Sequence, residues 1–130
     1  MSLWYFAHPY TVKDKYGNYS LAAETANFNL CCWRSGQLFL RGYNVYSPVA
    51  HTHSIHVATP EFLANEVHNM WYEMDEEFIR NTDFAGIILA PGWQRSDGCK
   101  KERALFEDLG REIRFFEAVM QEPVCLQDKL

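Results

Sequence analysis

The sequence lacks a long apolar run. The longest one, "FAGIILA" at Phe84–Ala90, is far shorter than the roughly 20 residues that a membrane-spanning helix needs. The first residues also lack the positively charged region that begins a secretory signal peptide, because the aromatic-rich segment "SLWYFA" follows Met1 directly. We therefore expect a cytoplasmic protein without a membrane partner.

Positive charge is also scarce. The chain has 12 Lys and Arg against 17 Asp and Glu, a formal net charge of −5, and its basic residues form no stripe. Since a protein holds duplex nucleic acid through such a stripe, we expect no nucleic-acid duplex as a partner. The four cysteines form no CxxC pair and are too few for a disulfide scaffold, which favours reduced thiols.

Several catalytic signatures are missing as well. The sequence has no GxSxG motif, no P-loop and no residues in the order of a Ser-His-Asp triad. We therefore expect neither an esterase nor an NTPase, and we expect no cofactor.

What the sequence does have is an alternation of strand and helix patterns. Its 130 residues, 48% of them hydrophobic, fit a single domain over residues 1–130. Strands are predicted in "LWYFAHP", "YNVYSPV", "FAGIILA" and "EIRFF". Helices are predicted from about Ser20 to between Ser35 and Arg41, and from Ser96 or Asp97 to Gly110. This order predicts an α/β fold with a doubly wound, mainly parallel open sheet of the flavodoxin or Rossmann type, flanked by helices.

A further helix is predicted between the second and third strands. Thr59 is the expected N-cap, Pro60 the first helical residue and Glu61 an acid in the first turn. The apolar stripe of this helix is Leu63, Val67, Met70, Trp71, Met74 and Phe78. Ligands of such sheets bind at the carboxyl ends of the strands, so the loops there are expected to form one crevice.

Two carboxylates lie on helix faces that should be apolar. Glu102 shares a face with Cys99 and Phe106, and Asp75 flanks the stripe beside Trp71. A buried carboxylate must be paired, hydrogen-bonded or open to a cleft. The spacing alone leaves two interpretations open, a solvated helix edge and a functional site.

Three segments resemble the nucleoside 2-deoxyribosyltransferase-like superfamily: "YFAHPYT", "MDEEFIRNTD" and "SDGCKKE". The segments "FAHPYT", "YSPVAHTHSI" and "PGWQRSDGCKKE" are similar to a branch of small single-domain bacterial and phage proteins. The resemblance implies a doubly wound α/β fold and chemistry at the N-glycosidic bond of a nucleoside or nucleoside 5′-monophosphate, by hydrolysis or by transfer. It also implies a homo-oligomer, a dimer or a tetramer, because sites of this family are often completed by a neighbouring subunit.

The resemblance also implies catalytic roles. Through the pattern Ser96-x-Gly98-x-x-x-Glu102, Glu102 matches the nucleophile that attacks the anomeric carbon. Tyr5 matches the tyrosine that orients this carboxylate. Asp75, followed eight residues later by Asp83, matches the acid that handles the base or the sugar.

The predicted substrate-binding residues lie around these three. The resemblance implies phosphate or sugar contacts at Ser96 and Gly98, and a helix N-terminus there suits an anion. Trp93 and Tyr10 are candidates for stacking on a base. The set is completed by His8 and His53, of which the resemblance favours the second as a pocket residue.

Two other functions remain open. The first is a binding module that holds a nucleotide on the same fold without turnover. The second is a metal-dependent hydrolase that uses His51, His53 and His56 of "HTHSIH", a segment interpreted as a loop at a strand end. No further ligand with suitable spacing is evident, so these histidines are also expected to line the crevice, and no metal site is predicted.

Overall fold

Four parallel strands form the sheet, in the order β2-β1-β3-β4. The computed structural model describes residues 2–125, except for the side chains of Glu61, Ala64, Asn65 and Val67. The strands are β1 (Leu3–Ala7), β2 (Asn44–Tyr46), β3 (Phe84–Leu89) and β4 (Glu112–Phe115). Since the order reverses between β1 and β3, the crevice at the carboxyl ends of these two strands is the expected ligand site of a doubly wound fold.

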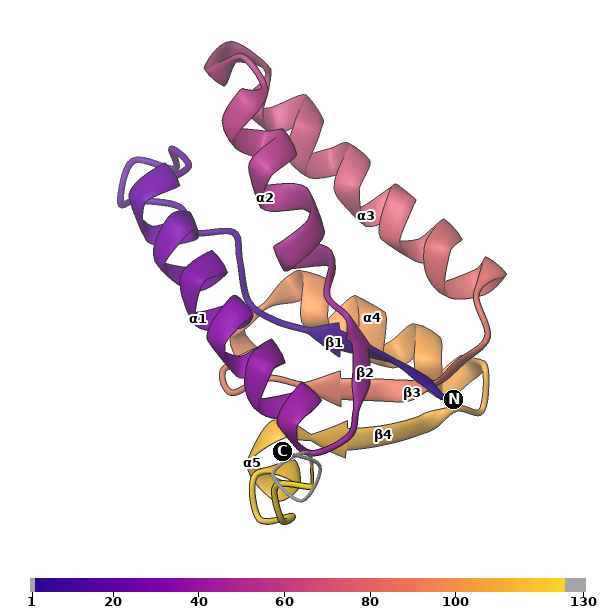
Figure 1. Cartoon of the computed structure of the whole chain (residues 1–130). Coiled ribbons are helices and arrows are strands. Elements are labelled where there is room, and N and C mark those ends of the chain that lie inside the picture. The colour runs from indigo at the N-terminus through magenta and orange to yellow at the C-terminus, as the bar shows by residue number, and fades with distance from the viewer. Residues whose placement is uncertain (1, 126–130) are drawn as a thin grey trace.

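Helices cover both faces of this sheet (Figure 1). They are α1 (Leu21–Leu40), α2 (Pro48–Ala58), α3 (Ala64–Asn81), α4 (Asp97–Asp108) and α5 (Phe116–Val119), with short 3₁₀ helices η1 (Glu61–Leu63) and η2 (Trp93–Arg95). The predicted fold class is confirmed. No helix in the described part of the chain is both long and apolar enough to cross a membrane.

The alternation of β1 divides the core into two clusters. Trp4 and Phe6 pack with α1 and α5 on one face, while Tyr5 and Ala7 pack with α3 and α4 on the other. The side chains of Tyr5, Phe6 and Ala7 have no exposed surface. Successive residues of one short strand therefore point to two different environments, and only the odd-numbered ones face α3 and α4.

The helix α2 is absent from the prediction, which placed the histidine-rich segment in a loop. Ser47 stands at the N-cap and Pro48 in the first turn, which are ordinary start signals. Thr59 was predicted to begin the next helix, but its hydroxyl donates to the carbonyl of Ile55 at 2.8 Å and Thr59 is the C-cap of α2. The predicted start of the next helix is therefore wrong, because α3 begins at Ala64 after η1.

The inward face of α3 also differs from the predicted stripe. Met70, Met74 and Phe78 are exposed by 63%, 39% and 38%. The helix turns Trp71 inward as predicted, but together with His68 and Asp75, and these three residues are spaced by three and four positions. The α2–α3 pair extends away from the sheet, so much of α3 has no strand to cover (Figure 1).

Candidate active site

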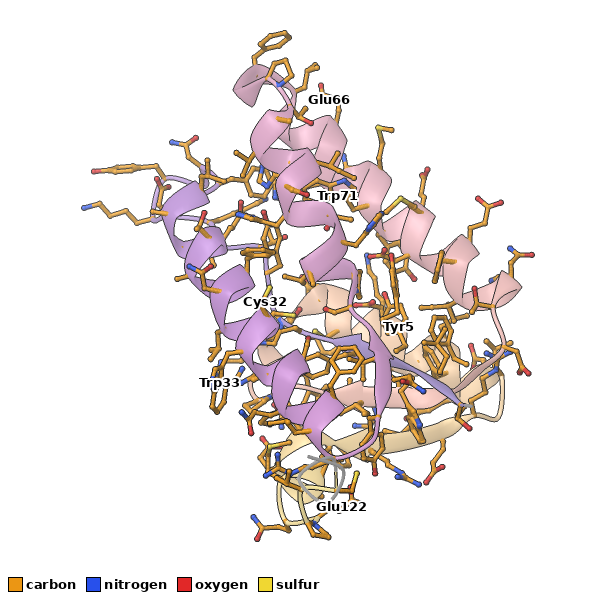
Figure 2. The ribbon with its side chains drawn as sticks, viewed as in Figure 1. Tyr5, Cys32, Trp33, Glu66, Trp71 and Glu122 are labelled. Carbon is orange, nitrogen blue, oxygen red and sulfur yellow. The ribbon has the colours of Figure 1, made fainter. Side chains whose placement is uncertain are left out.

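Tyr5, Asp75 and Glu102 come together from β1, α3 and α4. The Tyr5 hydroxyl donates a hydrogen bond to Glu102 Oε2, although the residues are 97 positions apart. Tyr5 is fully buried and Glu102 is 7% exposed. Figure 2 shows Tyr5 in the layer between the sheet and the helices. The structure therefore brings together the three residues predicted to be catalytic.

The start of α4 fixes the position of Glu102. Ser96 is the N-cap, and its hydroxyl oxygen accepts from the backbone N–H of Cys99 at 3.2 Å. This start turns Cys99, Glu102 and Phe106 toward the sheet, and all three are buried. The inward position predicted for Glu102 is confirmed, and the solvated-edge interpretation is excluded for this residue.

Burial dominates the electrostatics of the two carboxyl groups. It raises the pKa of Glu102 to about 8, with a further increase from the charge of Asp75 and a decrease from the Tyr5 hydrogen bond. Burial likewise raises the pKa of Asp75 to about 7. One oxygen of Asp75, Oδ1, is buried and has no hydrogen-bond partner among the described residues. An unpaired buried oxygen is costly, so this atom is a natural contact for a ligand.

These shifts determine which groups carry protons near neutral pH. Burial and the two nearby carboxylates raise the pKa of Tyr5 well above its ordinary value, so the hydroxyl remains a donor. Glu102 and Asp75 both titrate near neutrality, and two neighbouring acids of this kind lose their protons as a coupled pair. The site can therefore hold one protonated and one ionised carboxyl group, and the higher pKa of Glu102 places the proton on Glu102 when no substrate is bound.

Tyr46 belongs to the same site and was not predicted. It is the direct neighbour of Tyr5 in the parallel register of β1 and β2. Burial, then the charges of Asp75 and Glu102, raise the pKa of Tyr46 to about 12. Its ring stacks on Phe78 with centroids 4.4 Å apart. Tyr46 could have been predicted only from its alignment with Tyr5 in the neighbouring strand, and this alignment requires knowledge of the strand register.

Gly98 leaves space beside the nucleophile candidate. A Cβ atom built at Gly98 would lie 3.9 Å from Glu102 Oε1 and 4.0 Å from Ser96 Oγ. Gly98 is therefore adjacent to the Glu102 carboxyl group, and Ser96 is adjacent to Gly98 at the N-terminal end of α4. Amide groups at such an end attract anions.

A family model described as a domain of unknown function, DUF1937, matches residues 2–120. The chain belongs to the DUF1937 family. The DUF1937 match includes β1, α3 and α4 and therefore the whole of the candidate active site. No curated protein matches the chain.

Two other predicted binding residues of this DUF1937 domain are His8 and Trp93. His8 is on the α1 side, where Nδ1 contacts the carbonyl of Pro9 at 2.8 Å and Nε2 contacts Arg34 at 2.9 Å. Burial, followed by the Arg34 charge, lowers the pKa of His8 to about 4 despite the Pro9 contact. The ring of Trp93 lies under the Arg103 guanidinium, 4.6 Å from its centroid. Both side chains are thus engaged in contacts within the protein.

Tyr10 and His53 belong to a second polar cluster. The Tyr10 hydroxyl is 2.8 Å from His53 Nδ1 and 2.6 Å from His56 Nδ1. His51 is exposed and lies near Tyr46, with ring centroids 6.0 Å apart. The metal hypothesis built on the three histidines of "HTHSIH" is therefore wrong as a ligand set, because α2 turns His51 away from the other two.

Proposed function

We propose that the chain is an enzyme that cleaves or transfers at the N-glycosidic bond of a nucleoside or a nucleoside 5′-monophosphate. The observation that carries this proposal is a buried carboxyl group, Glu102, that accepts a hydrogen bond from a buried tyrosine and interacts electrostatically with a partly buried second acid. The residues are Glu102, Asp75 and Tyr5. The description of the DUF1937 family names no activity, so the proposal rests on the geometry of these residues and on the resemblance of the sequence segments.

The mechanism assigns one role to each group. When a substrate binds, the shared proton moves from Glu102 to Asp75. Ionised Glu102 then attacks the anomeric carbon, the bond from this carbon to the base nitrogen breaks, and its electron pair leaves with the base. Asp75 donates the proton that the departing base takes up. Tyr5 holds Glu102 in place and favours its ionised form, which the positive charge developing on the sugar also favours.

The second half of the reaction releases the sugar. Asp75, now ionised, takes a proton from a water molecule or from a second base, which attacks the anomeric carbon and frees Glu102. Water as the acceptor makes the enzyme a hydrolase, whereas a base makes it a transferase. Gly98 lies beside Glu102, and with Ser96 at the N-terminus of α4 it would contact the sugar or its 5′-phosphate.

The direct test is a panel of nucleosides and nucleoside 5′-monophosphates, assayed for released base by chromatography. The wild-type chain should release base from at least one compound, and Glu102→Gln should not. Glu107→Gln is the matched control, because Glu107 lies on the same helix but is exposed and paired with Arg103 at 2.9 Å. If compounds bind to the wild-type chain and to Glu102→Ala without any product, the fold serves as a binding module instead.

We also propose that the protein is a cytoplasmic homo-oligomer. Large apolar side chains are exposed along α1, among them Trp33 at 61% and Leu30 at 41%, and Figure 2 shows Trp33 projecting outward from this helix. Exposed apolar surface of this kind favours association with a second copy.

A further inference from the structure

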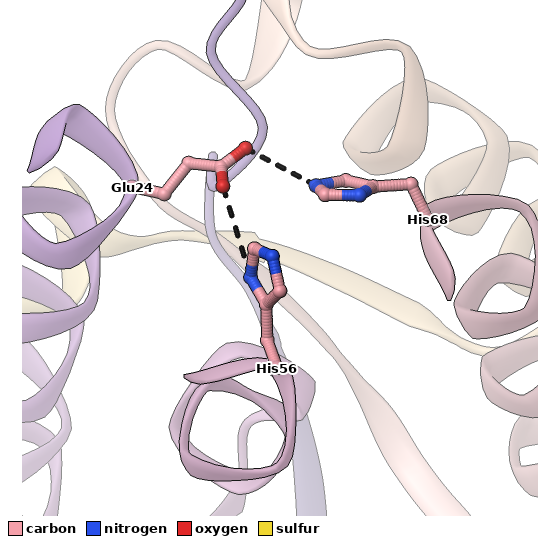
Figure 3. A group of neighbouring side chains, drawn as sticks. All are labelled: Glu24, His56 and His68. Atoms are coloured by element: carbon pink, nitrogen blue, oxygen red, sulfur yellow. Dashed lines mark hydrogen bonds and ion pairs between the residues drawn. The ribbon is translucent and has the colours of Figure 1, made fainter. Parts of the chain in front are cut away.

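A second constellation joins three helices, outside the candidate active site. Glu24 comes from the first turn of α1, His56 from the last turn of α2 and His68 from α3. Figure 3 shows the carboxylate of Glu24 with one oxygen toward each imidazole. Glu24 Oε1 is 3.7 Å from His56 Nδ1, and Glu24 Oε2 is 3.1 Å from His68 Nε2. Among the described residues, this is the group whose potential ligand atoms all lie within 4.8 Å of one another.

These distances suit a tetrahedral metal ion. Zinc bonds of about 2.0 to 2.2 Å at tetrahedral angles place neighbouring ligand atoms about 3.4 Å apart. The separations of 3.7 Å from Glu24 Oε1 and 3.1 Å from Glu24 Oε2 lie on either side of this value, and the three residues offer ligand atoms within 4.8 Å of one another. Two imidazoles and a carboxylate are also donors that zinc accepts, whereas calcium and magnesium prefer oxygen ligands only.

The burial and hydrogen bonding of the Glu24 carboxylate indicate that it binds a further group. Its side chain is fully buried, and Oε1 has no hydrogen-bond partner among the described residues. The other oxygen, Oε2, accepts from the backbone N–H of Val12 at 3.2 Å. A buried carboxylate oxygen without a donor is unfavourable, and a cation between Oε1 and the imidazoles would compensate it.

The imidazoles are held in place by aromatic neighbours. Tyr19 stacks on His68 with centroids 3.8 Å apart and planes 6° apart. Trp71 packs edge-on against His56 at 4.9 Å. A metal ion on His56 Nδ1 would displace the Tyr10 hydroxyl from this nitrogen, and the hydroxyl would keep its contact with His53 Nδ1. Such outer contacts orient metal ligands in proteins.

A surface pocket gives access to this cluster. It has a volume of about 700 Å³, and its walls include Glu24, His56, Tyr19, Asn18 and Thr59. Glu24 and His56 line this pocket, so three protein ligands would leave a fourth coordination position on the pocket side for water or a small anionic ligand. This is the arrangement that distinguishes catalytic zinc sites from closed structural ones.

We propose that Glu24, His56 and His68 bind one divalent transition-metal ion, with Zn²⁺ as the preferred ion, and leave one coordination position open to the pocket. The site is separate from the candidate active site. His68 and Asp75 are seven residues apart on α3, which corresponds to about 10 Å along the helix. Metal binding and base release are therefore tested independently of each other.

The test is a Zn²⁺ titration of chelator-treated protein by calorimetry, with metal content measured after dialysis. Wild type should bind one Zn²⁺ per chain with micromolar or tighter affinity. Glu24→Gln and His68→Asn should each weaken binding by at least about 100-fold, since each removes a ligand. His51→Asn is the matched control, because His51 lies on α2 and outside the cluster, and it should bind as wild type does.

Substitution with Co²⁺ keeps the proposal testable if a variant fails to fold. Wild-type protein loaded with Co²⁺ should show the intense visible absorption of a four-coordinate centre. The weak spectrum of the hydrated ion would overturn the proposal. So would a wild-type chain that retains no Zn²⁺, or Zn²⁺ binding that Glu24→Gln and His68→Asn leave unchanged, because Glu24 would then only form ion pairs with the two histidines.

Discussion

At the scale of single residues, Glu102 and Asp75 make the free energy of unfolding depend on pH. Their folded-state pKa values, about 8 for Glu102 and about 7 for Asp75, lie above the ordinary values of 4.5 and 3.8. The folded protein therefore binds these protons more tightly than the unfolded chain does. This stabilisation is complete below about pH 4 and is lost as the pH rises through the folded-state values.

We therefore predict that the free energy of unfolding falls on the order of a few kcal/mol between about pH 5 and about pH 9. Glu102→Gln should reduce this fall, because it removes one of the acids and keeps an acceptor for the Tyr5 hydroxyl. Urea denaturation at both pH values measures the effect, with Glu107→Gln as the control. A pH dependence that is the same in wild type and in Glu102→Gln would contradict the burial of this carboxyl group.

Tyr5 acts through Glu102, and its hydroxyl is the part that matters. Tyr5→Phe keeps the ring packed but removes the hydrogen bond that lowers the pKa of Glu102. We expect kcat/KM to fall about 10- to 100-fold and the lower limb of the pH profile to move to higher pH.

Tyr43→Phe is the control for this substitution. Tyr43 is another buried tyrosine, and its hydroxyl donates to a carboxylate oxygen of Glu122 at 2.6 Å. It lies in the core cluster on the opposite face of the sheet. An equal loss of activity in both variants would show that Tyr5 only supports the fold.

At the scale of the elements, the approach of β3 to β4 depends on Gly86. A Cβ atom there would lie 2.2 Å from the backbone carbonyl oxygen of Glu112 and 2.7 Å from a ring carbon of Trp4. Gly86→Ala should therefore destabilise the protein by about 1 to 3 kcal/mol. Gly36→Ala, inside α1 with no atom within 4 Å of the added Cβ, should stabilise it by about 0.5 to 1 kcal/mol. Thermal denaturation of both variants checks the pair, and equal effects would contradict the predicted strand packing.

The sequence predicted the elements that have clear periodicity. The buried strand at Phe84–Leu89 and the amphipathic α4 follow their patterns closely. The helix α2 was missed because it has no apolar stripe: its buried residues include Thr52 and His53. Without an apolar stripe after it, the Ser47-Pro48 start signal alone does not predict a helix, and the Thr59-Pro60 signal predicts a helix start where α2 ends.

Patterns within a single element also explain which site residues could be predicted from the sequence and which could not. Glu102 and Asp75 could be found because acids on apolar helix faces are unusual within a single element. Tyr46 depends on strand register, and the contact between Glu24 and His68 spans 44 positions. Such contacts arise from the packing of elements, which local spacing does not encode.

At the scale of the whole molecule, association should depend on the outer surface of α1. We expect light scattering to give the mass of a dimer or a tetramer for wild type. Trp33→Glu should reduce it to the mass of one chain, because a charge would replace the most exposed large apolar side chain of α1, 61% accessible. Phe62→Glu, which changes a residue in η1 that is 82% exposed, is the control and should leave the mass unchanged. A monomeric wild type would contradict the expectation.

The central claim is that Glu102 forms a covalent bond to the sugar, and the most direct measurement is mass spectrometry of the protein quenched during turnover. We predict a chain heavier by one pentosyl group, with or without its phosphate. Peptide mapping should place this group on Glu102, and it should be absent from Glu102→Gln. Base release that continues in Glu102→Gln, or an adduct on another residue, would contradict the account.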